Sequence, residues 1–153
     1  MLWRWPGQLP AGVEHHAPAS TLDLHPTLGG AAGAAPDDRL DGIDLLSRLA
    51  SASSGEAVDE ERSLHWECGF QWAIRDGDWK LAWTDPVSPA VGKLRDQEHA
   101  PLGEGWHLAD LGRDPGEQTN RYDDEPELVA RLMARHAAWR AEIGLPPRPV
   151  TAT

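Results

Sequence analysis

Hydrophobic residues recur at different spacings in different parts of this chain. Within residues 70–74 and 79–83, hydrophobic residues alternate with polar or small ones, and Asp76-Gly77 stands between the two runs. Such alternation is typical of strands with one buried face, and Asp-Gly is a strong hairpin signal. Trp66 and Trp106 lie in similar short patterns on either side. The pattern therefore predicts an antiparallel sheet built around a hairpin.

Beyond the sheet, the spacing becomes helical. Asp124 and Glu127 offer an N-cap and a capping-box residue, Pro126 suits a first helical turn, and Gly144 favours an end. The residues expected on the buried face are Leu128, Val129, Leu132, Met133, His136, Trp139 and Ile143. The arginines are expected on the other face or in the C-terminal half: Arg131, Arg135 and Arg140. The predicted fold class is α+β, a small antiparallel sheet packed with a C-terminal amphipathic helix.

The first third of the chain predicts smaller elements. Residues 2–5 read as a short strand that stops at Pro6-Gly7, because proline lacks a donor for the ladder. Ser20 and Asp23 resemble a capping pair for a short helix. Interior glycines at 29–33 weaken that helix. After a turn at residues 41–42, leucines at helical spacing predict another short helix over residues 45–49.

Composition divides the chain at an acidic, serine-rich stretch. Residues 51–61 read as a linker between residues 1–50 and residues 62–145, and residues 146–153 read as a disordered tail. Deprived of further partners, residues 1–50 are expected to be unstable, while residues 62–143 should hold together better.

Charge limits the function classes. The 153 residues carry a formal net charge of −11, which argues against nucleic acid or an anionic membrane as the main partner. The sequence contains neither a signal segment nor an apolar run long enough to span a membrane, and the compartment stays unknown. Eight tryptophans fit either a core or a sugar-stacking platform, and a hairpin under a helix favours the core.

Candidate chemistry is sparse. His65 and Cys68 have ligand spacing, but one cysteine cannot complete a multi-cysteine zinc site. Acidic pairs such as Asp37-Asp38 read as solvated turns rather than calcium loops. A nucleophile elbow and a phosphate loop are both absent from the sequence. Accordingly, no catalytic residue, no cofactor-binding residue and no metal ligand is assigned.

The order of several motifs carries a family resemblance. The segments are residues 4–7, residues 20–28, residues 40–46, residues 75–81 and residues 110–120, the last reading Asp-Leu…Asp-Pro-x-Glu-x-x-Asn. Together with the helix from Pro126 onward, they resemble the C-terminal portion of a sulfatase of the arylsulfatase type, in the alkaline phosphatase superfamily.

This resemblance implies an architecture and an activity. Residues 1–50 would be the last strand and helix of the sulfatase α/β domain, and residues 62–145 its C-terminal antiparallel-sheet subdomain. Sulfatases hydrolyse sulfate esters with a formylglycine and a divalent cation, usually calcium, and the motifs for both precede the matched region. Cys68 is followed by Gly69-Phe70, so it is not the modified residue. The resemblance therefore implies a chain inactive alone, with calcium bound only in a full-length enzyme.

The implied partner is the N-terminal catalytic part of a sulfatase, in the same or a separate chain. Two alternatives remain open from the sequence. One is a non-catalytic binding or complementation module. The other is a fragment of a related phosphodiesterase or phosphonate hydrolase.

Overall fold

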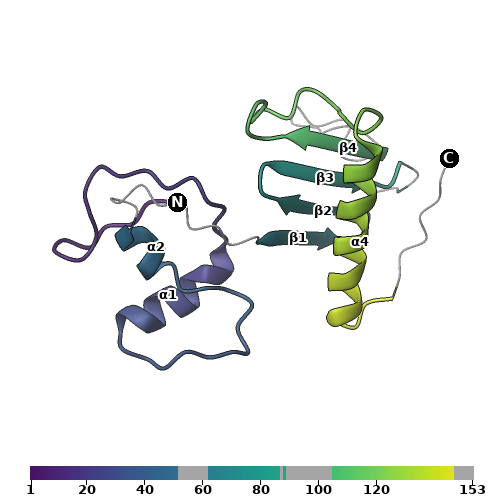
Figure 1. Ribbon diagram of the computed structural model, residues 1–153. Helices are drawn as coiled ribbons and strands as arrows, with labels where there is room; N and C mark the ends of the chain where they lie inside the picture. The colour runs from purple at the N-terminus through teal and green to yellow at the C-terminus, as the bar shows by residue number, and fades with distance from the viewer. Residues whose placement is uncertain (52–61, 87, 89–104, 147–153) are drawn as a thin grey trace. The chain divides into compact units, whose positions relative to one another are not determined.

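The computed structural model describes residues 1–51, 62–86, 88 and 105–146 (Figure 1). It divides into two compact units, Met1–Glu61 and Arg62–Thr153. The predicted linker and the predicted tail lie outside the described residues, apart from Ser51 and Pro146. Within the parts of the chain that are described, no helix is both long and apolar enough to cross a membrane.

The second unit contains the predicted antiparallel sheet. Its strands are β1 (Ser63–Cys68), β2 (Gln71–Asp76), β3 (Trp79–Thr84) and β4 (Gly105–Asp110), paired in the order β1-β2-β3-β4. The hairpin turn lies one residue later than predicted. Asp76 pairs with Trp79, so Gly77 and Asp78 form the two-residue loop. Gly77 takes φ +58°, at the position where type II′ hairpin turns carry glycine.

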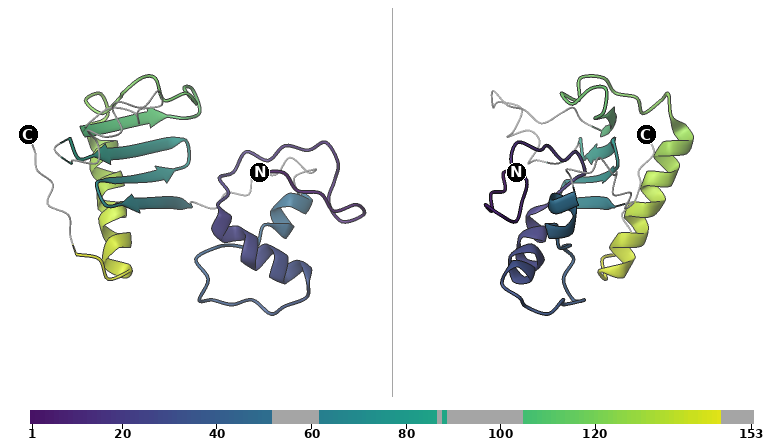
Figure 2. Two further views of the ribbon diagram at one scale, coloured as in Figure 1. Left: turned by 180° about the vertical axis from the view of Figure 1, so that it is seen from behind. Right: turned by 60° about the vertical axis from the view of Figure 1, so that its left-hand side comes forward.

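Helix α4 (Pro126–Glu142) crosses one face of this sheet and contacts β2 and β3 (Figures 1 and 2). Beneath it, Trp72, Trp83 and Trp106 are consecutive cross-strand neighbours. The buried core comprises Trp72, Ile74, Leu81, Leu108, Val129 and Leu132. The remaining tryptophans of β3 and β4 pack against it. This tryptophan face is therefore core rather than a sugar platform, as the pattern favoured.

The ends of α4 agree only partly with the prediction. Pro126 occupies the first turn, and Gly144 takes φ +74° just beyond the helix, as glycine does at C-terminal caps. The predicted N-cap is wrong: Glu125 occupies the cap position and makes no side-chain cap hydrogen bond. Asp124 instead accepts a hydrogen bond from Arg121, at 2.9 Å. The carboxylate of Asp124 therefore binds Arg121, three residues earlier, instead of capping the start of the helix.

The described residues of the first unit form three short elements: the 3-10 helix η1 (Thr21–Asp23), α1 (Leu24–Ala31) and α2 (Leu46–Ser51). The capping box between Ser20 and Asp23 is present. Helix α1 continues through Gly29 and Gly30 before it ends. Asp23 accepts hydrogen bonds from the backbone of Ser20 at 2.7 Å and of Ile43 at 3.0 Å, which ties the helix start to the loop before α2.

Two further contacts make this connection close. The hydroxyl of Thr27 donates to the carbonyl of Ile43 at 3.4 Å and accepts from the amide of Leu45 at 3.0 Å. A Cβ on Gly42 would lie 2.0 Å from the backbone oxygen of Leu22, so the predicted turn there requires glycine for its close approach. The loop and helix α1 thus form one hydrogen-bonded assembly.

Residues 2–5 are not a strand, which corrects the prediction made for them. The turn at Pro6-Gly7 is present, and Leu9 donates back to Trp5 at 2.9 Å. A strand needs a neighbour for its backbone groups. No other described segment of this chain pairs with residues 2–5. Their hydrophobic pattern is compatible with a strand, but the pattern cannot show whether a neighbouring strand is present.

Candidate functional site

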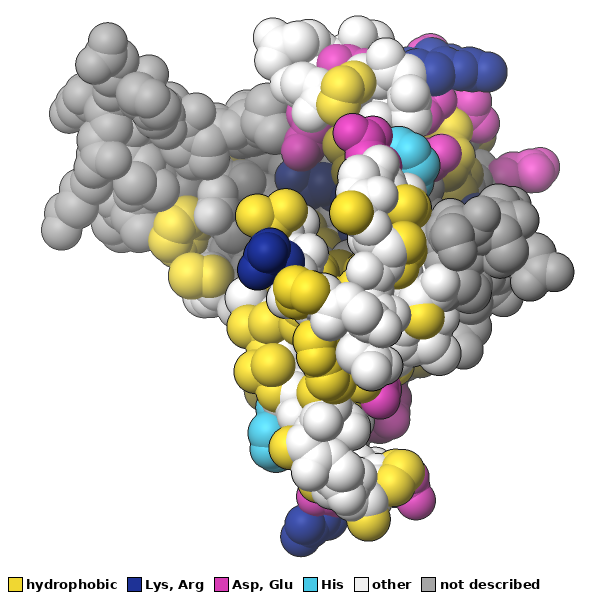
Figure 3. Space-filling model, turned by 90° about the vertical axis from the view of Figure 1, so that its left-hand side faces the viewer, with side chains coloured by type: hydrophobic (Ala, Val, Ile, Leu, Met, Phe, Trp, Pro, Cys, Tyr) yellow, Lys and Arg dark blue, Asp and Glu magenta, His cyan; other side chains and the backbone are white. Residues whose placement is uncertain are grey.

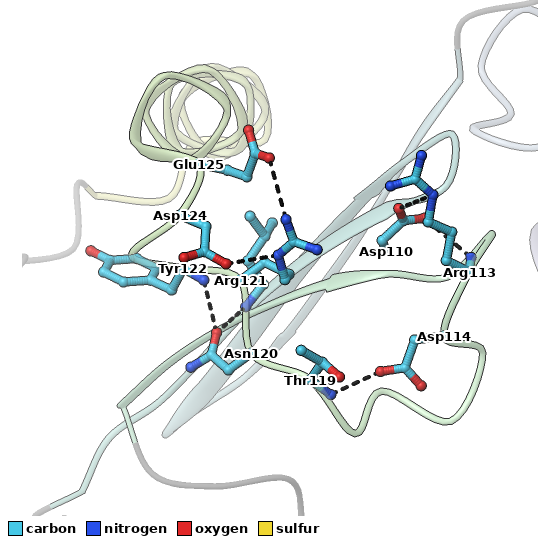
Figure 4. Close-up of polar contacts among 10 residues, drawn as sticks. Asp110, Arg113, Asp114, Thr119, Asn120, Arg121, Tyr122, Asp124 and Glu125 are labelled. Atoms are coloured by element: carbon cyan, nitrogen blue, oxygen red, sulfur yellow. Dashed lines mark hydrogen bonds and ion pairs between the residues drawn. The ribbon is translucent and has the colours of Figure 1, made fainter.

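The segment between β4 and α4 contains the acidic motif of residues 110–120 (Figure 4). Its aspartate side chains accept hydrogen bonds from backbone amides of the same segment. Asp110 accepts hydrogen bonds from the amides of Gly112 at 3.1 Å and Arg113 at 3.3 Å. Asp114 accepts from the amide of Thr119 at 2.8 Å. Side-chain carboxylates that satisfy nearby amides are typical of turns. These two residues therefore shape the loop.

Asn120 holds the end of this loop against β4. Its Oδ1 accepts from the amide of Leu108 at 3.0 Å, and its Nδ2 donates to the carbonyl of Trp106 at 2.9 Å. The same Oδ1 also accepts from the amide of Tyr122 at 3.0 Å (Figure 4). Arg121 adds a backbone hydrogen bond to the carbonyl of Leu108 at 2.8 Å. One side chain thus performs the role of a neighbouring strand for two residues of β4.

Replacing Asn120 by alanine should lower the free energy of unfolding by about 1–3 kcal/mol, because partly buried backbone groups of β4 lose their partners. Urea unfolding followed by tryptophan fluorescence measures the change. Gln118, which is exposed and donates to the carbonyl of Gly116 within the loop, offers a matched control. Its replacement by alanine should change stability by less than about 0.5 kcal/mol. Equal effects of the two substitutions would contradict this role.

Glu117, the glutamate of the motif, has a strained backbone conformation. Its φ of +54° is the left-handed conformation, which non-glycine residues adopt only under constraint. Lys80 of β3 supplies that constraint by donating to both carboxylate oxygens, at 2.7 and 2.8 Å. The loop is thereby attached to the sheet face opposite α4.

A second polar cluster lies between β1 and α4, and it was not predicted. Glu67 on β1 forms an ion pair with Arg140 on α4, and its other oxygen lies 3.7 Å from Nε2 of His136. Arg140 also donates to the carbonyl of Pro146. Arg140 was expected on the outer face or near the helix end, but it is only 6% exposed. Its spacing of four residues from His136 is the signal that could have placed it on the buried face.

Two imidazoles complete this cluster. Nδ1 of His65 lies 3.2 Å from Nδ1 of His136, a hydrogen bond in which one ring donates. His65 stacks on Trp139 at 4.8 Å between ring centroids, and His136 stacks on Trp72 at 4.2 Å. Burial lowers the pKa of His65 to about 4, with help from the neighbouring His136 and the Arg135 guanidinium. Asp76 opposes this shift.

The lowered pKa of His65 predicts pH-dependent stability. Between pH 6.5 and about 4 the unfolded chain binds a proton at His65 that the folded chain does not, so stability should fall as the pH falls through this window. The expected loss is on the order of 1–2 kcal/mol after allowance for partial exposure. Urea unfolding at pH 7 and pH 4.5 measures it.

The variant His65→Phe keeps a ring against Trp139 and removes the titrating group. We expect its stability to change less over the same pH range, while wild type and a His25→Phe control behave alike. His25 is exposed in the first unit and tests whether any histidine would do. Parallel pH profiles for wild type and His65→Phe would disprove the assignment.

The polar contacts described above hold the loop and helix α4 to the sheet, and the described residues do not form a recognisable reaction centre. Among the described residues, no three His, Cys, Asp or Glu side chains are grouped to hold a metal ion. His65 and Cys68, which have ligand spacing in the sequence, are three residues apart on β1 and therefore face opposite sides of the sheet. Cys68 is exposed as a free thiol.

Comparison with known proteins places these features in a family. No family model matches the chain. Bovine arylsulfatase A is 33% identical over 147 residues, which cover 84% of this chain and 27% of that protein. Human arylsulfatase D is 31% identical over 164 residues, which cover 92% of this chain and 26% of that protein. The chain thus spans about a quarter of the length of these curated relatives.

Solved structures agree in fold. A protein solved in complex with its substrate D-glucosamine-2-N,6-O-disulfate superimposes with a TM-score of 0.60 at 19% identity, covering 90% of this chain and 27% of its own. Ps i-CgsB gives a TM-score of 0.60 at 22% identity, covering 88% and 27%.

The antiparallel sheet with its C-terminal helix is therefore an α+β fold of the kind found in sulfatase C-terminal subdomains. The chain corresponds to the C-terminal portion of a sulfatase of the arylsulfatase type, which confirms the resemblance carried by its motifs.

Proposed function

We propose that this chain is the C-terminal portion of an enzyme that hydrolyses sulfate esters and that it has no activity alone. One observation carries the proposal: arylsulfatases match most of this chain, whereas the chain spans about a quarter of their length. An upstream catalytic part, in the same or a separate polypeptide, would supply the reacting groups. Any calcium would be bound there as well.

The roles of the described polar residues support this division of labour. Asp110 and Asp114 accept backbone hydrogen bonds within their loop, and Glu117 and Glu67 form ion pairs with Lys80 and Arg140. Carboxylates that are committed in this way stabilise the fold. Residues 1–50 would then be the end of the α/β domain, and residues 62–145 the C-terminal subdomain.

Hydrolysis of 4-nitrophenyl sulfate tests the proposal. We expect the chain alone to release no more nitrophenol than buffer does. A chimera that joins the upstream part of bovine arylsulfatase A to this chain should hydrolyse the sulfate ester, with the intact bovine enzyme as the control. Turnover by the chain alone would contradict the predicted inactivity. To separate the related phosphodiesterases, this chain must be joined to its own upstream part: faster cleavage of an aryl phosphate diester than of the sulfate by that enzyme would favour them.

A further inference from the structure

Helix α1 turns its polar side chains inward and its leucines outward. Asp23 and Thr27, four residues apart at its start and centre, are fully buried. Leu24 and Leu28, which also share one face, are 37% and 59% exposed. Ala31 continues the same face one turn later and is exposed as well. We call Leu24, Leu28 and Ala31 the leucine face.

This arrangement reverses the usual one, in which a helix buries its apolar stripe. The hydrogen bonds of Asp23 and Thr27 to the loop before α2 explain why the polar stripe is inside. They also fix the orientation of α1, so the leucine face cannot rotate inward without breaking them. The leucine face is therefore held outward by the fold of the first unit itself.

In the first unit as a whole, large hydrophobic side chains are more often exposed than buried. Among the described residues, its one buried hydrophobic side chain is Leu45. Its exposed large hydrophobic residues are Met1, Leu2, Trp5, Val13, Leu22, Leu24 and Leu28. Figure 3 faces this unit and shows hydrophobic side chains at its surface. Exposed apolar groups gathered on one unit indicate a surface that another polypeptide covers.

We propose that the leucine face is the docking surface for the upstream catalytic part of a sulfatase. This inference rests on the proposed function and adds the contact surface to it. Roughly three quarters of the length of these relatives lies outside the matched portion, so a polypeptide large enough to cover the face belongs to the same enzymes. Solved structures that cover about 90% of this chain match it over both of its units.

A second copy of this chain fits the surface less well. Each copy carries a formal charge of −11, which opposes self-association.

The test uses the full chain and a tagged upstream part of bovine arylsulfatase A that lacks the matched segment. Binding is measured by biolayer interferometry for wild type, for the double variant Leu24→Glu/Leu28→Glu, and for the control variant Ile143→Glu in the second unit. Both variants exchange exposed side chains, and circular dichroism checks that each protein is folded. We expect the double variant to bind at least about tenfold more weakly and the control to bind as wild type does.

Each outcome separates the two proposals. If the double variant binds as tightly as wild type, the leucine face is not the docking surface, while the proposed function stands. If folded wild type does not bind the upstream part although the chimera described above is active, the docking inference fails alone; if the chimera is inactive as well, the proposed function itself fails. A wild-type dimer that the double variant dissolves, seen by sedimentation velocity, would identify a second copy as the occupant and overturn the inference.

Discussion

Replacing Glu67 by alanine is expected to lower the free energy of unfolding of the second unit by about 3–5 kcal/mol, one of the largest effects of any single substitution in this chain. The side chains of Glu67 and Arg140 are only 15% and 8% exposed. The substitution would therefore remove the carboxylate partner of a guanidinium that water reaches poorly. His136 would lose the same neighbour, 3.7 Å away. Urea unfolding followed by tryptophan fluorescence measures the loss.

A double variant separates the charge from the packing. Glu67→Leu combined with Arg140→Met removes both charges and should recover most of the stability, because an apolar pair of similar size has no buried charge to compensate. Glu67→Gln, which keeps an acceptor, should fall between alanine and wild type. If Glu67→Ala unfolds within about 0.5 kcal/mol of wild type, the ion pair does not hold β1 to α4.

The second large effect is expected at Leu81, in the middle of the sheet. Leu81 is fully buried, and its cross-strand neighbours Ile74 and Leu108 are fully buried as well. Leu81→Ala should cost about 2–5 kcal/mol, since it removes buried methyl groups and leaves a cavity under α4. The same unfolding experiment measures it.

Ile143→Ala is the matched control for Leu81→Ala. The prediction that Ile143 lies on the buried face is wrong: the helix ends at Glu142, and Ile143 is 48% exposed just beyond it. Its replacement by alanine should cost less than about 1 kcal/mol. A loss at Leu81 no greater than the loss at Ile143 would show that the sheet and α4 are not packed around this residue.

The sequence predicted the second unit well because its signals are local. Alternation around residue 77 and helical spacing after Pro126 depend on neighbours a few positions apart, and both elements are present. The ion pair between Glu67 and Arg140 joins residues 73 positions apart, and no local pattern connects them. Arg140 was therefore predicted from its charge and its place near the helix end, and its burial was missed.

The first unit shows the opposite case. The capping box at Ser20 and Asp23 was predicted from two residue types at the right spacing, and it forms. The strand at residues 2–5 depends on a partner that a hydrophobic pattern cannot provide, and it does not form. The expectation that residues 1–50 are less stable than residues 62–143 stays a prediction, and hydrogen exchange would test it.

The position of Asn120 also limits how this protein can associate. An unpaired strand edge is a template on which another chain can add a strand, and such addition leads to aggregation. The side chain of Asn120 occupies the amide of Leu108 and the carbonyl of Trp106, two backbone groups with which an incoming strand would have to pair. A single carboxamide thus opposes the addition of another strand at this stretch of β4.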